Sequence, residues 1–316
     1  MIERMLQRLS DWWFEPAPAT RLAVLRVLIG GWVIYYIGKR VDLLADVCRG
    51  DPMMFEPVGL AHLLSKPLPP VVFDSSVTLL LILAILTVLG VAYRIVGPAF
   101  AILLLAVLSY RNSWSMIYHS DNALVLQALA LGLGPAAAAW SLDARQAAKA
   151  GGAPPGPSWR FGWPIRLMCV ATVLTYFLAG VAKVAGPLGW SWVTGESLRS
   201  QIGIDAVRKY AFGKEAPDLF YLVYDQLWLF TAIGILSLAF ELAAPLFLAR
   251  RWSGKVWAVG TWLMHWGIYF LMDIKFRYQL AGIMFAPFFK VEKPVEWVLR
   301  RMSRPTPEHD TSCDPD

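Results

Sequence analysis

Eight apolar segments are distributed along this 316-residue chain, and they limit it to a membrane fold. A helix needs about 20 mostly apolar residues to cross the hydrocarbon core of a bilayer, or somewhat fewer where it is short. The second, third and fourth segments contain no charged residue, while the last is short enough to be a partial or re-entrant span. We therefore predict an all-α, polytopic integral membrane helical bundle with about eight transmembrane helices. The segments are 22–38, 76–93, 95–110, 123–140, 165–182, 227–249, 256–274 and 278–289.

The composition supports a membrane location and argues against a nucleic-acid partner. Hydrophobic residues make up 57% of the chain and charged residues 16%, whereas about a quarter of an ordinary soluble domain is charged. The fifteen tryptophans and eleven tyrosines are typical of the two bilayer interfaces. The formal charge of +6 comes from short basic runs between apolar segments rather than from one patch with interleaved aromatic residues. The lipid bilayer is therefore the expected partner.

The distribution of charge predicts the orientation of the bundle. The connections 141–164 and 250–255 and the tail after residue 289 are rich in lysine and arginine, so they belong on the cytoplasmic side. The long loops 39–75 and 183–225 are nearly balanced, with four basic to five acidic residues and five to five, and they belong outside. Eight crossings place both termini in the cytoplasm.

The chain divides into an anchor, a membrane domain and a tail. Residues 1–19 have apolar residues at helical spacing, which predicts an amphipathic interfacial helix or, alternatively, a solvated cap on the bundle. Residues 20–290 form the transmembrane domain, with a linker at 141–164. Four glycines and four prolines between 149 and 164 predict irregular structure there. Residues 291–316 are a basic interfacial segment and a polar tail predicted to be disordered.

Cysteine usage and short motifs exclude several chemistries. Cys48, Cys169 and Cys313 lie far apart without a C-x-x-C pair, so they define no disulfide framework and no metal site, although one bridge stays open. The chain has no G-x-S-x-G, no H-E-x-x-H and no glycine loop for phosphates. We therefore expect no metal and no nucleotide-driven reaction.

Two charged residues fall at the cytoplasmic half of the apolar segments. Arg26 lies about one turn into the first segment, and Glu241 lies about three turns from the inner end of the sixth. A charge at membrane depth is costly unless it is paired. We predict a structural ion pair between Arg26 and Glu241, ahead of a catalytic role for either.

Three further polar residues fall in the outer half. His265 lies near mid-bilayer, where a lone histidine is more often a hydrogen-bonded core residue than a catalyst. His119 stands just before an expected helix start, with Asp121 and Asn122 as possible caps, and its simplest interpretation is a loop residue. Lys183 ends the fifth segment ahead of Gly186-Pro187. Such a lysine either reaches to the interface or, kept from water, acts as a base because burial favours the neutral amine.

Four stretches carry a family resemblance: "RNSWSMIYHSDNALVLQALALGLGPAAAAWSLDA", "YFLAGVAKVAGPLGWSWVTGESL", "FELAAPLFL" and "MHWGIYFLMDI". From about residue 15 to about 290 the chain resembles the horizontally transferred transmembrane (HTTM) family, which includes the vitamin K-dependent gamma-glutamyl carboxylase. The resemblance implies that Lys183 is the base for reduced vitamin K or menaquinol, that His119 contributes, and that His265 corresponds less closely. It also implies a site on the outer side of a bacterial plasma membrane.

The resemblance leads to two functional hypotheses. The first is a lyase-type membrane enzyme that uses a reduced quinone, O2 and CO2 to carboxylate glutamate in a peptide at the outer face, with Trp190 and Trp192 lining the quinone's entry or serving as belt residues. The alternative is a non-carboxylating membrane factor for peptide or toxin maturation or export. We expect no large lumenal domain of the kind found in the animal carboxylase, which leaves the peptide open. A transporter has less support, because the two halves show no repeat.

Overall fold

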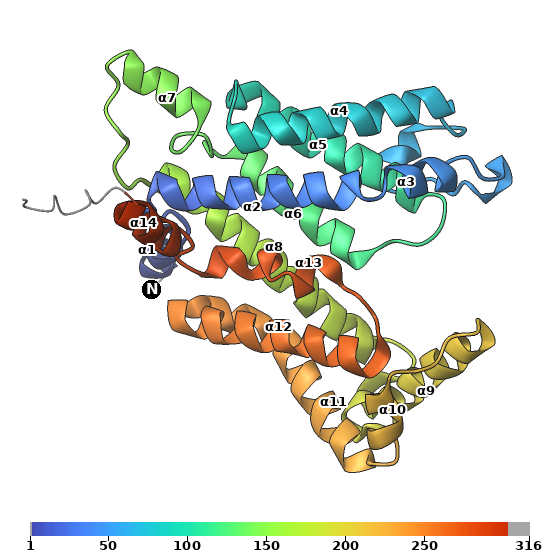
Figure 1. Ribbon diagram of the computed structural model, residues 1–316. Coiled ribbons are helices and arrows are strands. Elements are labelled where there is room, and N and C mark those ends of the chain that lie inside the picture. Colours follow the sequence, from blue (N-terminus) through green and yellow to red (C-terminus); the bar gives the residue numbers. More distant parts are fainter. Residues whose placement is uncertain (1, 303–316) are drawn as a thin grey trace, which may run out of the picture.

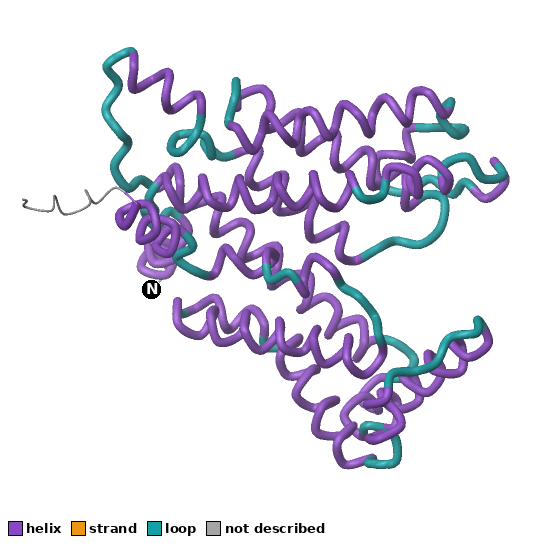
Figure 2. The backbone as a smooth tube through the Cα atoms, in the orientation of Figure 1, coloured by secondary structure: helices purple, strands orange, loops and turns teal. Residues whose placement is uncertain are grey.

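The computed structural model describes residues 2–302, and the described chain folds as helices joined by turns (Figure 2). The only pairing of strand type within this range is an isolated bridge between Ala17 and Ser158. The first half contains α1 Ile2–Trp13, α2 Ala19–Gly38, α3 Val41–Val47, the 3-10 helices η1 Pro52–Met54 and η2 Gly59–Leu63, α4 Pro70–Leu89, α5 Tyr93–Asn112, α6 His119–Leu133 and α7 Leu142–Lys149. The second half contains α8 Trp159–Ala185, η3 Gly189–Thr194, α9 Glu196–Ala211, α10 Asp218–Val223, α11 Leu227–Leu242, η4 Ala244–Ala249, α12 Arg251–Met272, α13 Arg277–Leu280, η5 Ile283–Phe288 and α14 Glu292–Met302.

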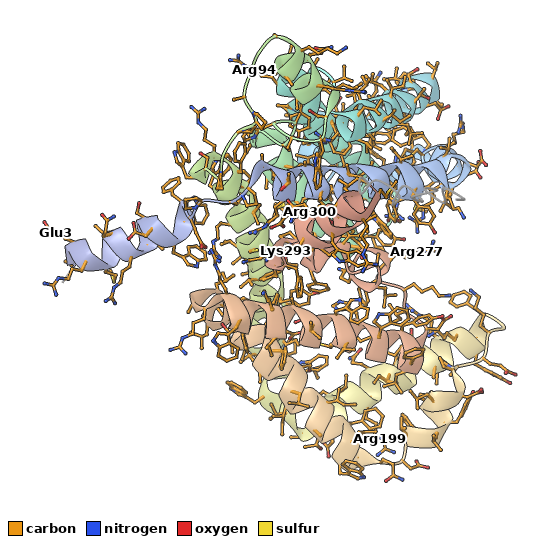
Figure 3. All side chains as sticks on the ribbon, turned by 60° about the vertical axis from the view of Figure 1, so that its left-hand side comes forward. Glu3, Arg94, Arg199, Arg277, Lys293 and Arg300 are labelled. Atoms are coloured by element: carbon orange, nitrogen blue, oxygen red, sulfur yellow. The ribbon has the colours of Figure 1, made fainter. Side chains whose placement is uncertain are left out.

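The starts of three long helices gather on one side of the bundle. In Figure 1, α2, α8 and α12 begin on the left, where α1 and α14 also lie. The bridge from Ala17 to Ser158 joins the residues just before α2 and α8, and the Trp12 indole donates to the carbonyl of Leu248, close to the start of α12. We call this side the terminal face. Figure 3 shows α1 projecting from this face with Glu3 toward its free end.

Four helices, α2, α4, α5 and α8, are long and apolar enough to cross a membrane. The apolar helices α6 and α11 have 15 and 16 residues, fewer than the roughly 20 that a bilayer core requires. Gly134 and Pro135 end α6 before the predicted limit of 140, and Pro245 follows the end of α11 within the predicted segment 227–249. Thus the helical membrane fold is confirmed, and the count of about eight crossings is not.

The predicted eighth segment, 278–289, is broken into α13 and η5 rather than forming one helix. Gly282 has φ +74°, a left-handed conformation that glycine adopts without steric cost, and it separates the two short helices. The side chains of Tyr278, Met284 and Phe285 are buried. Non-helical backbone is tolerated at membrane depth only where protein surrounds it, so this packing is compatible with the re-entrant alternative, which stays a prediction.

The predicted linker is irregular only in its middle. Helix α7 occupies 142–149, with the Ser141 hydroxyl accepting from the amide of Ala144. Helix α8 starts at Trp159 with Ser158 as its cap. The expectation of irregular structure between 149 and 164 is therefore wrong from residue 159 onward, where the Ser158 cap starts α8 within the glycine–proline run.

The N-terminal segment is helical, and two of the three cysteines are buried. Residues 2–13 are helical as predicted, whereas the tail expected to be disordered, 303–316, lies outside the described residues. Cys48 and Cys169 are buried and unbridged, and Cys313 falls in the undescribed tail. Burial raises the pKa of the Cys48 thiol to about 12, so this group stays protonated and unreactive at neutral pH.

Candidate functional site

Lys183 forms an ion pair with Glu241. Its ammonium Nζ lies 2.6 Å from Oε1 and 2.7 Å from Oε2 of that carboxylate. The Glu241 side chain is 7% exposed and that of Lys183 28%. The Trp192 ring, carried by η3, lies 5.3 Å from the same ammonium, within the range of a cation–π contact. Lysine and carboxylate thus meet between α8 and α11 under an aromatic ring.

The predicted pair of Arg26 with Glu241 is wrong. Arg26 is fully buried and donates to the carbonyls of Ala136 and Trp140, at 3.1 and 2.5 Å. These carbonyls lie in the turns that follow the end of α6. Arg26 therefore ties α2 to the turn after α6, and Glu241 takes Lys183 as its partner instead.

A glycine allows α8 and α11 to approach closely at this pair. A Cβ placed on Gly180 would lie 2.8 Å from the Cβ of Glu241 and 3.2 Å from the amide nitrogen of Leu242. Tyr176, Gly180 and Lys183 stand at positions i, i+4 and i+7 of α8, so they share one face of that helix. The stretch "YFLAGVAK" thereby places a phenol, a close-contact glycine and an amine along the same face.

His265 belongs to a buried cluster beside this face. Its Nδ1 lies 2.8 Å from the carbonyl of Thr261, and its Nε2 lies 3.4 Å from the hydroxyl of Tyr176. Because a carbonyl can only accept, Nδ1 carries the proton and Nε2 accepts from the phenol. The rings of Trp257, Phe276 and Phe285 surround the pair. His265 is thus a hydrogen-bonded core histidine, and Tyr176 joins it to the face of α8 that carries Lys183.

His119 is the first residue of α6 rather than a loop residue before it. Gln127 of α6 meets Thr172 of α8, and Gly134, just after the end of α6, meets Pro164 of α8, so the two helices are antiparallel. Extending this register places the backbone of His119 level with the turn of α8 at Gly180. Lys183 lies three residues beyond that level, about 4.5 Å along the axis of α8.

The two expected caps of α6 do not function as caps. The helix follows Tyr118, which makes no side-chain cap. The buried carboxylate of Asp121 instead accepts from the Tyr36 hydroxyl at 2.7 Å and pairs with Arg111 at 3.1 Å. A charged partner on a neighbouring helix outcompetes capping, because a buried carboxylate needs one.

The structure contains a buried polar network around Gln127 that the sequence did not predict. The Gln127 amide donates to the Thr172 hydroxyl and to the carbonyl of Met284, and it accepts from the Tyr278 hydroxyl. This network joins α6, α8 and the broken segment 277–288. The available signal was Gln127, a polar side chain within an otherwise apolar, charge-free segment.

The two tryptophans assigned to the quinone differ in their surroundings. Trp192 contacts the Lys183 ammonium, whereas Trp190 is 62% exposed, as a residue at the bilayer interface would be. Among the residues that the structure describes, no group of three or more His, Cys, Asp and Glu could hold a metal ion.

These features define an integral membrane protein of the helical, polytopic class with a partly buried lysine–glutamate pair. A family model, the HTTM domain, matches residues 14–275, and the chain belongs to the HTTM family. This domain also occurs as the membrane domain of the vitamin K-dependent carboxylase. No curated protein and no solved structure matches the chain.

Proposed function

We propose that this protein is a quinol-dependent membrane enzyme that carboxylates glutamate in a peptide, with Lys183 as the base. The observation that carries the proposal is the pairing of Lys183 with the carboxylate of Glu241 at 2.6 and 2.7 Å, on a face of α8 that also presents Tyr176. The match to the HTTM family supports the same reaction class.

Glu241 gives Lys183 a route to the neutral form that a base requires. Passing one proton from Nζ to a carboxylate oxygen leaves an amine and a carboxylic acid and removes both charges. The adjacent opposite charge favours the ammonium, whereas desolvation disfavours both charges, so the proposal requires a bound substrate to exclude water from the pair. The amine then takes a proton from a substrate, and Glu241 retains the first proton. Tyr176 and His265 provide a second hydrogen-bonded pair deeper in the bundle.

The residues around Lys183 fit an apolar quinol. Trp192 lies over the ammonium, and Leu178, Val181 and Leu188 expose large apolar side chains on the same stretch of chain. When bound, a reduced vitamin K or menaquinol would supply, with O2, the strong base that removes a proton from the γ-carbon of glutamate. The aromatic and aliphatic side chains would hold the ring and exclude water.

The test uses purified full-length protein with menaquinol or reduced vitamin K, a glutamate peptide and bicarbonate labelled with carbon-14. We expect quinone epoxide and labelled peptide from the wild type, and a loss of about 100-fold or more in Lys183→Met, the range removed with a general base. Lys209→Met is the matched control, because Lys209 also pairs with a carboxylate, that of Asp205, but on α9.

Two results would contradict the proposal. Equal activity in Lys183→Met and Lys209→Met, with both proteins folded, would remove Lys183 from the reaction. The absence of epoxide and labelled peptide with every quinol tested would favour the alternative of a non-carboxylating factor for peptide or toxin maturation or export.

A further inference from the structure

A basic pocket opens at the terminal face, far from Lys183. It has a volume of about 80 Å³, several times the roughly 10–15 Å³ that one water molecule occupies. It therefore has room for a group of several heavy atoms. Arg166 on its wall and Lys183 are 17 residues apart on α8, about 25 Å along the helix axis, so the pocket is separate from the candidate active site.

The lining of the pocket is strongly positive. One carboxylate, that of Glu15, faces six basic side chains: Arg21, Arg166, Arg250, Arg251, Lys255 and Lys290. Glu15 pairs with both Arg166 and Arg251, and Arg21 is held by Glu292 of α14. In the described part of the chain, Arg250 and Lys255 have no carboxylate within ion-pairing distance. The pocket therefore contains more positive charge than its own acids neutralise.

The helix ends add to this charge. Helices α2, α8 and α12 all start at this face, and Arg250 and Arg251, at the first turn of α12, line the pocket. Neither α2 nor α12 has a side-chain cap at its start. Their free amide groups and dipoles favour a negative charge at this position.

Apolar side chains around the pocket indicate what carries the negative charge. Leu246 and Trp252 stand next in the chain to the lining residues Phe247 and Arg251, and they are 74% and 62% exposed. The amphipathic helix α1 is fixed at the rim by the hydrogen bond from Trp12 to Leu248, and it exposes Ile2, Met5, Leu6 and Leu9. A free phosphate ion would gain nothing from these surfaces, whereas acyl chains would cover them.

From the cavity, its charge and its apolar rim, we propose that this pocket binds the phosphodiester headgroup of an anionic phospholipid of the cytoplasmic leaflet. Arg250, Lys255 and Lys290 contact the phosphate, and the acyl chains lie against Leu246, Trp252 and α1. Basic pockets between membrane helices on the cytoplasmic side are known to bind such headgroups. The site does not depend on the proposed function.

The test compares lipid binding by two variants of equal charge. Purified full-length protein is titrated with phosphatidylglycerol or phosphatidylcholine, and lipid adducts are counted by native mass spectrometry. We expect phosphatidylglycerol to bind Arg250→Gln/Lys255→Gln about 30-fold more weakly than wild type, the loss for two juxtamembrane cations. The control, Arg94→Gln/Lys149→Gln, removes two positive charges that lie outside the pocket, and it should bind phosphatidylglycerol as wild type does. Figure 3 shows Arg94 apart from the α14 residues Lys293 and Arg300.

Three outcomes would overturn the proposal. Equal weakening in both variants would reduce the effect to general surface charge. Equal affinity for phosphatidylglycerol and phosphatidylcholine would exclude a headgroup site. Displacement of phosphatidylglycerol by inorganic phosphate or glycerophosphate at the same concentration would show that the pocket binds a free phosphate rather than a lipid. Should the double variant fail to fold, Lys290→Gln applies the same criteria with about a fivefold loss.

Discussion

At the scale of single residues, charges at membrane depth are satisfied by partners that sequence position alone does not reveal. The sequence placed Glu241 in the cytoplasmic half with Arg26 and placed Lys183 in the outer half, yet Glu241 pairs with Lys183. Arg26 binds two backbone carbonyls instead. A guanidinium can donate to carbonyl oxygens as well as to a carboxylate, and Arg26 does so through its two terminal nitrogens while its Nε has no partner among the described residues. The pairing is therefore decided by which helices touch.

Substitutions of Arg26 and Glu241 should act independently on stability. Arg26→Ala removes two charge-assisted hydrogen bonds, worth roughly 1.5–3 kcal/mol each. Because Glu241 shares no partner with Arg26, the effects on the free energy of unfolding should add to within about 0.5 kcal/mol in the double variant Arg26→Ala/Glu241→Gln. Denaturant titration in detergent measures this. A coupling energy well above that limit would show that Arg26 and Glu241 interact, as the sequence predicted.

Substitutions of Lys183 and Glu241 should, in contrast, be strongly coupled. Lys183→Met leaves the carboxylate of Glu241 buried and unpaired, at a cost of roughly 3 kcal/mol in the free energy of unfolding, the low end for a buried pair because Lys183 is partly exposed. Adding Glu241→Gln should recover much of that loss. A double-mutant cycle measures the coupling, and a double variant no more stable than Lys183→Met would show that no such pair exists.

At the scale of helices, Gly180 controls the approach of α11 to α8. Gly180→Ala would place a Cβ 2.8 Å from that of Glu241, so the helices must separate and the ion pair must lengthen. We expect destabilisation of roughly 1–3 kcal/mol despite the higher helix propensity of alanine. Gly31→Ala on α2 is the matched control, because nothing lies within 4 Å of its Cβ and alanine should stabilise there by up to about 1 kcal/mol. Equal effects on the melting temperature would contradict the close contact.

The docking of α14 on α2 should depend on pH. Burial raises the pKa of Glu292, but the hydrogen bonds and charge of Arg21 outweigh it, so the pKa of this carboxyl lies below its usual 4.5. A lowered pKa in the folded state adds stability above the unfolded value, and this stability is lost as the pH falls through the folded value.

The Glu292→Gln variant tests this dependence. Its melting temperature should fall below that of wild type at neutral pH, and the difference should shrink as the pH drops below about 4.5, because wild type then loses the same ion pair. Glu3→Gln, at the exposed start of α1, should match wild type throughout. A constant difference at all pH values would mean that the Arg21 pair adds nothing.

At the scale of the whole molecule, the sequence predicted the fold class but not how the second half packs. Hydropathy locates apolar helices well, because a long apolar run in lipid can only be satisfied as a helix; the predicted segment 76–93 overlaps α4, although that helix runs from Pro70 to Leu89. Hydropathy fails at 277–288, where Gly282 and Pro287 interrupt the helix. There the short segments are stabilised by burial against neighbouring helices rather than by the length of one continuous helix. Tyr176 and Gln127 were missed for the same reason: their partners come from helices distant in sequence.

The orientation of the bundle in the membrane remains a prediction, and it can be tested with two cysteines. In a variant whose three native cysteines are replaced by serine, Ala153→Cys lies in the exposed connection between α7 and α8, and Lys214→Cys lies in the exposed loop after α9. Helix α8 separates these two positions, so one crossing by α8 places them on opposite sides.

The basic residues near Ala153 predict that this residue faces the cytoplasm. A membrane-impermeant maleimide should therefore label Lys214→Cys in intact cells and Ala153→Cys only after permeabilisation. The reverse pattern would place Lys183 on the cytoplasmic side and the basic pocket outside, while labelling of both in intact cells would show that α8 does not cross the membrane.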